Sequence, residues 1–170
     1  MDKDLFNNAE LIGQQLLKKN EVIAVAESCT GGWIAKCFTD VAGSSNWFDR
    51  GFVVYNAQAK QQMLGISPEI IKQNGEVSEP TVLALAQAVL ANSRASISVA
   101  ISGIAGPGGG STDKPVGLIW FAWAHAEQKM GVVSKVQSHA RKMIFSGDRE
   151  SVRRESVLYA MQGILELLSE

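Results

Sequence analysis

The chain has 170 residues, of which 46% are apolar and 19% are charged, and this composition is typical of a globular protein with one domain. Its net charge of −1 argues against nucleic acid as a partner, and neither a signal peptide nor the roughly 18 apolar residues of a membrane span is found. Two cysteines outside any CxxC motif indicate a reducing cytoplasm, and two histidines offer little to a metal site.

The first half of the chain predicts helices that alternate with strands. Apolar residues spaced by three or four from Leu5 to Leu16 predict an amphipathic helix that ends near residue 20. Ser78 and Pro80 are typical of a helix N-cap and a first turn. In chain order, we expect strands at 22–26 and 51–55, and helices at 33–41, 57–64, 68–73 and from residue 78.

The second half predicts strands before a final helix. We expect a strand at 96–101, a glycine-rich loop at 103–115, and two strands at 116–124 and 131–136 that form a hairpin. A helix that begins at 147–149 follows. This order favours a single α/β domain over residues 1–170, an α/β/α sandwich with a mixed, mostly parallel sheet.

The segment AESCTGG at 26–32 follows the first predicted strand and opens a predicted helix. Exposed N–H groups and the helix dipole favour developing negative charge at such a turn. Ser28 and Cys29 are both candidate nucleophiles, and their spacing does not choose between them. A structural alternative stays open, in which Thr30 caps the helix and the two glycines permit close packing.

Lys60 is a candidate base for this nucleophile. Tyr55 ends a predicted strand, and Lys60 lies about one turn into the helix that follows. Active sites of open α/β sheets gather at strand ends of this kind. Burial disfavours the charged form of a lysine, which can then act as a general base. The alternative is a solvated lysine on the surface.

The stretch SGIAGPGGGS at 102–111 follows another strand. Its glycines allow backbone N–H groups to turn inward around an anion. It matches neither the Walker A pattern nor GxGxxG, so triphosphate hydrolysis and dinucleotide binding lose support. The hydroxyls of Ser102 and Ser111 favour phosphate or sugar binding over the alternative of a flexible surface loop.

Arg149 and Arg153 are four residues apart and therefore share one face of the last helix near its N-terminus. Cations at this end oppose the helix dipole. An anionic ligand would resolve the conflict, because arginine binds phosphate through paired hydrogen bonds. Ion pairs with Asp148, Glu150 and Glu155 are the alternative.

Taken together, these motifs resemble the CinA C-terminal domain family, specifically its stand-alone nicotinamide-nucleotide amidases. The resemblance runs from about Leu5 to Leu165, and several ordered motifs are more specific than any single one. Larger members carry an additional N-terminal domain, for which 170 residues leave no room. The matching segments are AESCTGG at 26–32, GFVVY at 51–55 with Lys60, SGIAGPGG at 102–109, KPVG at 114–117 and FSGDR at 145–149 with Val152 and Arg153.

The resemblance implies hydrolysis of nicotinamide mononucleotide (NMN) to nicotinate mononucleotide and ammonia, in pyridine-nucleotide (NAD) salvage and without a cofactor or metal. It implies Ser28 as the nucleophile, Lys60 as its base and Tyr55 as an assisting group. Glu27 would orient Lys60, face the pyridinium or form a structural ion pair. The expected substrate-binding residues are Glu27, Cys29, Thr30, Gly31, Ser102, Gly103, Ala105, Gly106, Gly108, Gly109, Arg149 and Arg153.

Two other functions stay open from the sequence. One is a non-catalytic, nucleotide-sensing or competence-related module that only binds in the same pocket. The other is a Ser-Lys amidase that acts on a different amide. We also expect a homodimer. Trp47, Phe48 and the apolar strand 118–123 are candidates for its interface, although core packing is the favoured use of most of these residues.

Overall fold

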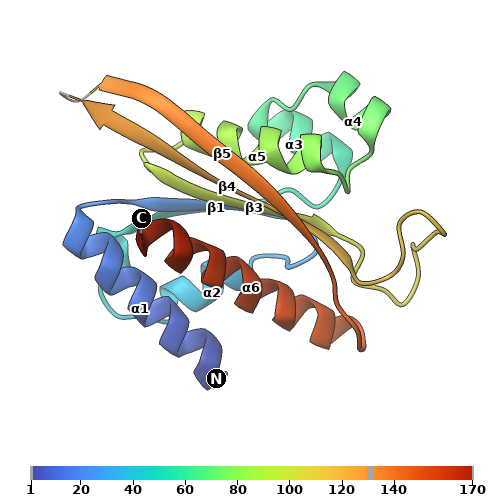
Figure 1. Cartoon of the computed structure of the whole chain (residues 1–170), viewed down its shortest axis with the longest axis horizontal. Helices are drawn as coiled ribbons and strands as arrows, with labels where there is room; N and C mark the ends of the chain where they lie inside the picture. The colour runs from blue at the N-terminus through green and yellow to red at the C-terminus, as the bar shows by residue number, and fades with distance from the viewer. Residues whose placement is uncertain (1, 130–131, 170) are drawn as a thin grey trace.

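The computed structural model describes residues 2–129 and 132–169, and one five-stranded sheet lies at its centre (Figure 1). The strands are arranged in the order β2-β1-β3-β4-β5. β1 is parallel to β2 and β3, whereas β4 is antiparallel to both β3 and β5, so four strands share one direction. This confirms a mixed, mostly parallel sheet. The strands are β1 (Ile23–Glu27), β2 (Phe48–Val53), β3 (Ile97–Gly103), β4 (Leu118–Lys129) and β5 (Val132–Ile144).

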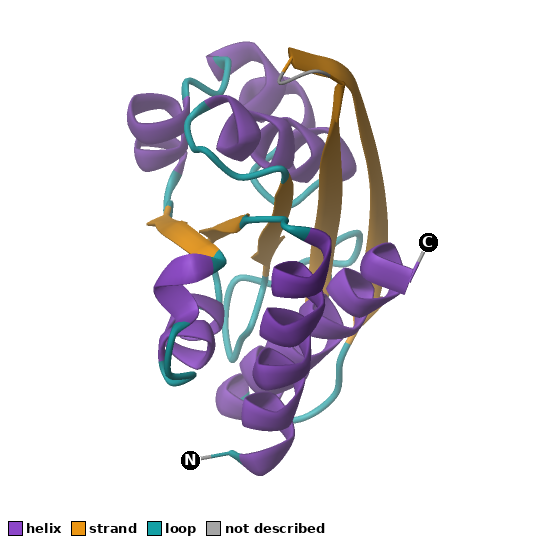
Figure 2. Cartoon of the chain, turned by 90° about the vertical axis from the view of Figure 1, so that its left-hand side faces the viewer, coloured by secondary structure: helices purple, strands orange, loops and turns teal. Residues whose placement is uncertain are grey.

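Helices cover both faces of this sheet, which confirms the predicted three-layer α/β/α arrangement (Figures 1 and 2). One layer holds α1 (Lys3–Lys19), α2 (Trp33–Thr39) and α6 (Arg149–Ser169). The other layer holds α3 (Ala57–Leu64), α4 (Pro68–Asn74) and α5 (Glu79–Ala91), and a short 3₁₀ turn spans Ser44–Asn46.

Most helices begin at a polar side chain that bonds the free N–H groups of the first turn. Asn56 caps α3, Ser67 caps α4, and the predicted cap Ser78 accepts from the N–H of Thr81 at the start of α5. α2 differs, because its N-cap is Gly32, which has no side chain to accept these bonds. The free N–H groups at the start of α2 must therefore bond to the side chain of another residue.

The two faces of the sheet carry side chains of different size. On β4, the large residues Phe121 and Trp123 point toward the layer of α1, α2 and α6, whereas Ala122 and Ala124 point toward α5. β1 repeats this alternation with branched residues on one face and alanines on the other, as expected for the period of two in a strand. The alanines allow α5 to lie close to the sheet, and both faces are buried.

Most of the residues considered for a homodimer interface pack in the core of this chain instead. Trp47 and Trp123 are fully buried within this chain, and so is Phe121. Trp47 packs against Gly13 of α1, and Trp123 packs against Gly163 of α6. Their burial confirms core packing, and it removes them as a dimer interface.

The strand boundaries differ most from the prediction in β2, β4 and β5. β2 begins at Phe48 rather than residue 51, and β4 extends to Lys129. β5 continues to Ile144, well beyond the predicted end at 136, while its predicted first residue lies outside the described part of the chain. β5 is an edge strand that presents mostly exposed side chains over 135–144, so no apolar alternation marks it.

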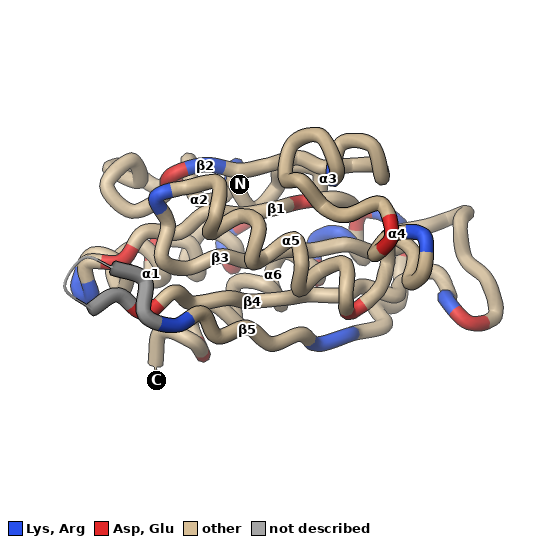
Figure 3. Tube along the Cα trace, turned by 90° about the horizontal axis from the view of Figure 1, so that it is seen from above, with Lys and Arg blue, Asp and Glu red and all other residues tan. Residues whose placement is uncertain are grey.

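Figure 3 shows lysine and arginine positions interspersed with acidic positions along the trace. This distribution agrees with the net charge of −1. Among the helices of the described residues, none is long and apolar enough to cross a membrane.

Candidate active site

The carboxyl ends of three parallel strands meet at one edge of the sheet. Glu27, the last residue of β1, pairs with Val53 of β2 and with Ile101 of β3. Ser28 therefore emerges between the exits of β2 and β3. Because open α/β sheets place their sites at such carboxyl ends, this edge is the expected location of chemistry.

Lys60 reaches Ser28 from the first turns of α3. Its Nζ lies 3.4 Å from Oγ of Ser28 and donates to the carbonyl oxygen of Val54 at 3.0 Å. A third bond runs from Nζ to Oε2 of Glu76 at 2.9 Å. The side chain of Lys60 is fully buried, so the alternative of a surface lysine is wrong.

The carboxylate of Glu27 lies away from Lys60 and caps α2. Its two oxygens accept from the backbone N–H groups of Gly32 at 3.0 Å, Ile34 at 3.2 Å and Ala35 at 2.9 Å. Glu27 is buried, and both of its carboxylate oxygens accept bonds from the start of α2. Glu27, rather than Thr30 of the structural alternative, therefore provides the cap of α2. A contact of Glu27 with substrate stays a prediction.

Arg153 holds the turn that carries Ser28. Its Nε donates to the carbonyl of Cys29 at 3.0 Å, and its Nη2 donates to the carbonyl of Thr30 at 2.9 Å. The guanidinium also lies over the ring of Trp33, 5.2 Å from the ring centroid. Two polar side chains thus hold the nucleophile turn, Glu27 through N–H groups at the start of α2 and Arg153 through carbonyl groups.

A cavity of about 240 Å³ opens above Ser28. Arg149 crosses it, with Nη1 donating to the carbonyl of Gly106 and Nη2 to Oη of Tyr55, both at 2.8 Å. Arg149 does not pair with its acidic neighbours, which was the alternative. The cavity is lined by Ser28, Cys29, Tyr55, Gly103, Ile104, Ala105, Gly106, Gly108, Gly109 and Arg149.

Five of the predicted binding residues do not line this cavity, and Glu27, which caps α2, is one of them. Thr30, Gly31 and Arg153 line a separate surface pocket beside Trp33. Ser102 is buried, and its Oγ donates to the carbonyl of Glu76 at 2.8 Å. The N–H of Gly31 closes the turn onto the carbonyl of Ser28 at 3.1 Å, so it is already occupied as a donor.

The environment of Cys29 distinguishes the two candidate nucleophiles. Burial raises the pKa of the Cys29 thiol to about 12, and the carboxylate of Glu27 adds to the rise. A thiol attacks as its thiolate, which this environment disfavours at neutral pH. The hydroxyl of Ser28 has a base within reach, and the geometry therefore favours Ser28.

Glu76 is the site residue that the sequence analysis missed. It lies on the turn between α4 and α5, and its side chain is 40% exposed. A single glutamate in a stretch of ordinary polar residues carries no motif. Only the burial of Lys60, which requires a counter-charge, could have indicated that a carboxylate lies nearby.

Comparisons with known proteins show the family of this chain. The model of the CinA C-terminal domain matches residues 6–168. The protein named nicotinamide-nucleotide amidohydrolase PncC of Escherichia coli strain K12 is 48% identical over 161 residues, which cover 95% of this chain and 93% of that protein. The protein of the same name from Pseudomonas putida is 44% identical and covers 95% and 96%.

A solved structure extends the likeness to three dimensions. The competence/damage inducible protein CihA from Agrobacterium tumefaciens superposes with a TM-score of 0.87 at 38% identity, over 98% of this chain and 96% of that one. Sequence motifs, family model and fold therefore agree over nearly the full length. The chain belongs to the CinA C-terminal domain family.

Proposed function

We propose that this protein is an amidase that hydrolyses the carboxamide of NMN, giving nicotinate mononucleotide and ammonia. The relatives that are 44% and 48% identical carry the name of a nicotinamide-nucleotide amidohydrolase. The observation that carries the proposal is a fully buried Lys60 whose Nζ lies 3.4 Å from Oγ of Ser28 at the base of a cavity. A serine hydroxyl needs such a base to become a nucleophile.

In the proposed mechanism, Oγ of Ser28 attacks the carboxamide carbon while neutral Lys60 accepts the hydroxyl proton. The tetrahedral intermediate then collapses, its C–N bond breaks, and Lys60 donates a proton to the departing ammonia. An ester between Ser28 and the nicotinoyl group remains, and water hydrolyses it with Lys60 again as the base. Each proton that Lys60 accepts is returned, so the base is regenerated.

The cavity provides groups that suit a mononucleotide. Arg149 places a guanidinium beside the glycine-rich loop, and arginine binds phosphate by paired hydrogen bonds. Tyr55 lies on the same side of the cavity and is joined to Arg149. We propose that Arg149 binds the phosphate and that Tyr55 assists at the reacting end.

The substrate class is tested by measuring ammonia release from NMN, NAD, nicotinamide riboside and free nicotinamide. We expect NMN to give the highest kcat/KM, because Arg149 and the loop can bind its phosphate. If another amide is hydrolysed faster than NMN, the enzyme is a Ser-Lys amidase of different specificity. If NMN shifts the melting temperature without any ammonia release, the protein is a binding module and the proposal is wrong.

Within this proposal, the protein acts in the cytoplasm in NAD salvage. A homodimer stays a prediction, and analytical ultracentrifugation of the purified chain tests it. A sedimentation mass of twice 18.3 kDa supports the dimer, and a mass of one chain contradicts it.

A further inference from the structure

Among the described residues, the buried Lys60 has one ionic partner, and that partner lies outside the motifs that carry the family resemblance. Oε2 of Glu76 accepts from Nζ of Lys60 at 2.9 Å. Lys60 is fully buried, whereas the side chain of Glu76 is 40% exposed. A buried ammonium is costly unless it is paired and hydrogen-bonded, so this contact stabilises the charged form of Lys60.

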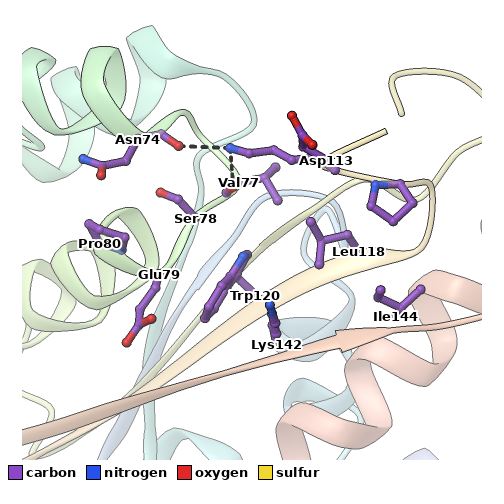
Figure 4. A pocket seen from close by; sticks show the side chains of 12 residues that line it. Asn74, Val77, Ser78, Glu79, Pro80, Asp113, Leu118, Trp120, Lys142 and Ile144 are labelled. Carbon is purple, nitrogen blue, oxygen red and sulfur yellow. Dashed lines mark hydrogen bonds between the residues drawn. The ribbon is translucent and has the colours of Figure 1, made fainter. Parts of the chain in front are cut away.

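The backbone around Glu76 is held in place by two other elements. The carbonyl of Glu76 itself accepts from Oγ of Ser102, at the end of β3. Nζ of Lys114, from the glycine-rich loop, donates to the carbonyls of Asn74 at 3.0 Å and Val77 at 2.9 Å, on either side of Glu76 (Figure 4). The turn is therefore anchored at three carbonyl groups, those of residues 74, 76 and 77, and the carboxylate of Glu76 bonds Lys60.

Other charged or titratable groups near this site are engaged elsewhere. Glu27, at the end of β1, accepts three N–H bonds from α2, and the Tyr55 hydroxyl after β2 accepts from Arg149. Cys29, beside Ser28, is a buried thiol. The remaining partners of Nζ are neutral, namely the Ser28 hydroxyl and the Val54 carbonyl. Among the described residues, Glu76 alone offers a carboxylate to Lys60.

We propose that Glu76 is a positioning residue for the reaction, which orients Nζ of Lys60 toward Ser28 and sets the pH range in which Lys60 can act as a base. This inference rests on the proposed Ser-Lys mechanism. When Oγ of Ser28 attacks, its proton passes to Nζ, and the Glu76 carboxylate stabilises the ammonium so formed.

The first experiment compares pH profiles of kcat/KM for NMN hydrolysis. Glu76→Gln keeps an oxygen that can accept from Nζ but removes the negative charge. The acidic limb of the profile is expected to move to lower pH by about one unit, because an opposite charge at this distance favours the protonated lysine. Glu76→Ala removes the acceptor as well and is expected to lower kcat by about tenfold or more at every pH.

Glu79→Gln is the matched control, because Glu79 lies three residues further on, in the first turn of α5. It removes one negative charge from the same region, and its profile should overlay that of the wild type. A Glu76→Gln profile that overlays the wild type, in a protein with an unchanged melting temperature, would overturn the proposal. A purely structural role of Glu76 predicts that result.

A second readout does not depend on turnover. Lysine labelled with ¹³C at Cε reports the protonation of Nζ by NMR, and Lys60→Met assigns the signal of Lys60. We expect Glu76→Gln to move the titration of this signal to lower pH. If the wild type releases no ammonia from NMN but the signal moves, the proposed function fails and the link between Glu76 and Lys60 stands. If ammonia is released and the signal does not move, the inference about Glu76 is overturned.

Discussion

Nζ of Lys60 and Oγ of Ser28 lie 3.4 Å apart, although 32 residues separate them in the chain. The distance is slightly longer than a strong hydrogen bond, and catalytic contacts of this kind often tighten once substrate is bound. Parallel β1 and β2 bring the two residues together, since Ser28 follows β1 and α3 begins after β2. The contact between the two side chains is thus a direct consequence of the sheet topology.

Cys29→Ser is expected to keep NMN hydrolysis within about threefold of the wild type, because a thiol this deeply buried remains protonated. For the same reason, prolonged treatment of the native enzyme with iodoacetamide should leave the rate of ammonia release unchanged. Activity lost in parallel with alkylation of Cys29 would mean that the thiol takes part in the reaction.

Arg149→Met is expected to raise KM for NMN by about tenfold or more, since a hydrogen bond to a charged group contributes about 1.5–3 kcal/mol. KM for nicotinamide riboside, which lacks the phosphate, should change much less. Arg153→Met is the contrasting variant, because Arg153 bonds the carbonyls of Cys29 and Thr30. It should lower kcat for both substrates alike, and equal effects of Arg149→Met on both would exclude the phosphate contact.

Glu27→Gln is expected to lower the free energy of unfolding by about 2 kcal/mol. The amide has one acceptor oxygen where the carboxylate has two, and it loses the favourable interaction with the N-terminus of α2. Urea denaturation measures the change. Glu10→Gln, at an exposed position of α1, is the control. If Glu27→Gln lowers the free energy of unfolding by no more than the control does, Glu27 contributes little to the cap.

Gly163→Ala tests the packing of α6 on the sheet. A Cβ at this position would lie 2.3 Å from the Trp123 ring, which is fixed by a bond from its Nε1 to the carbonyl of Ala160. Overpacking should lower the free energy of unfolding by about 1–3 kcal/mol, despite the higher helix propensity of alanine. A variant with raised thermal stability would contradict this packing.

The order of predicted strands and helices predicted the fold well, because buried strands and capped helices can each be recognised from apolar spacing and capping residues in the sequence. It did not predict whether Ser28 and Lys60 meet, because that depends on the parallel pairing of β1 with β2, which no local pattern shows. The extent of β5 could not be predicted in this way. Its exposed edge carries polar side chains, so pairing with β4 rather than burial determines where it ends.

Side-chain roles within the nucleophile turn were harder to predict. Gly31 and Gly32 both adopt left-handed conformations, with φ of 63° and 93°, and this leaves α2 to be capped by Glu27 instead of Thr30. Arg153 has the residue type of a phosphate ligand but bonds carbonyl oxygens of the turn. Glu76 reaches Lys60 across 16 residues of chain, a relationship that no spacing rule contains.

The central claim is that Ser28 attacks the carboxamide of NMN with Lys60 as its base. Its most direct test is the rate of ammonia release from NMN by purified, folded Ser28→Ala, measured beside Cys29→Ser. The account predicts that Ser28→Ala loses activity by about 10³-fold or more, as expected when a nucleophile is removed, while Cys29→Ser stays close to the wild type. Ammonia release by Ser28→Ala at the wild-type rate would contradict it.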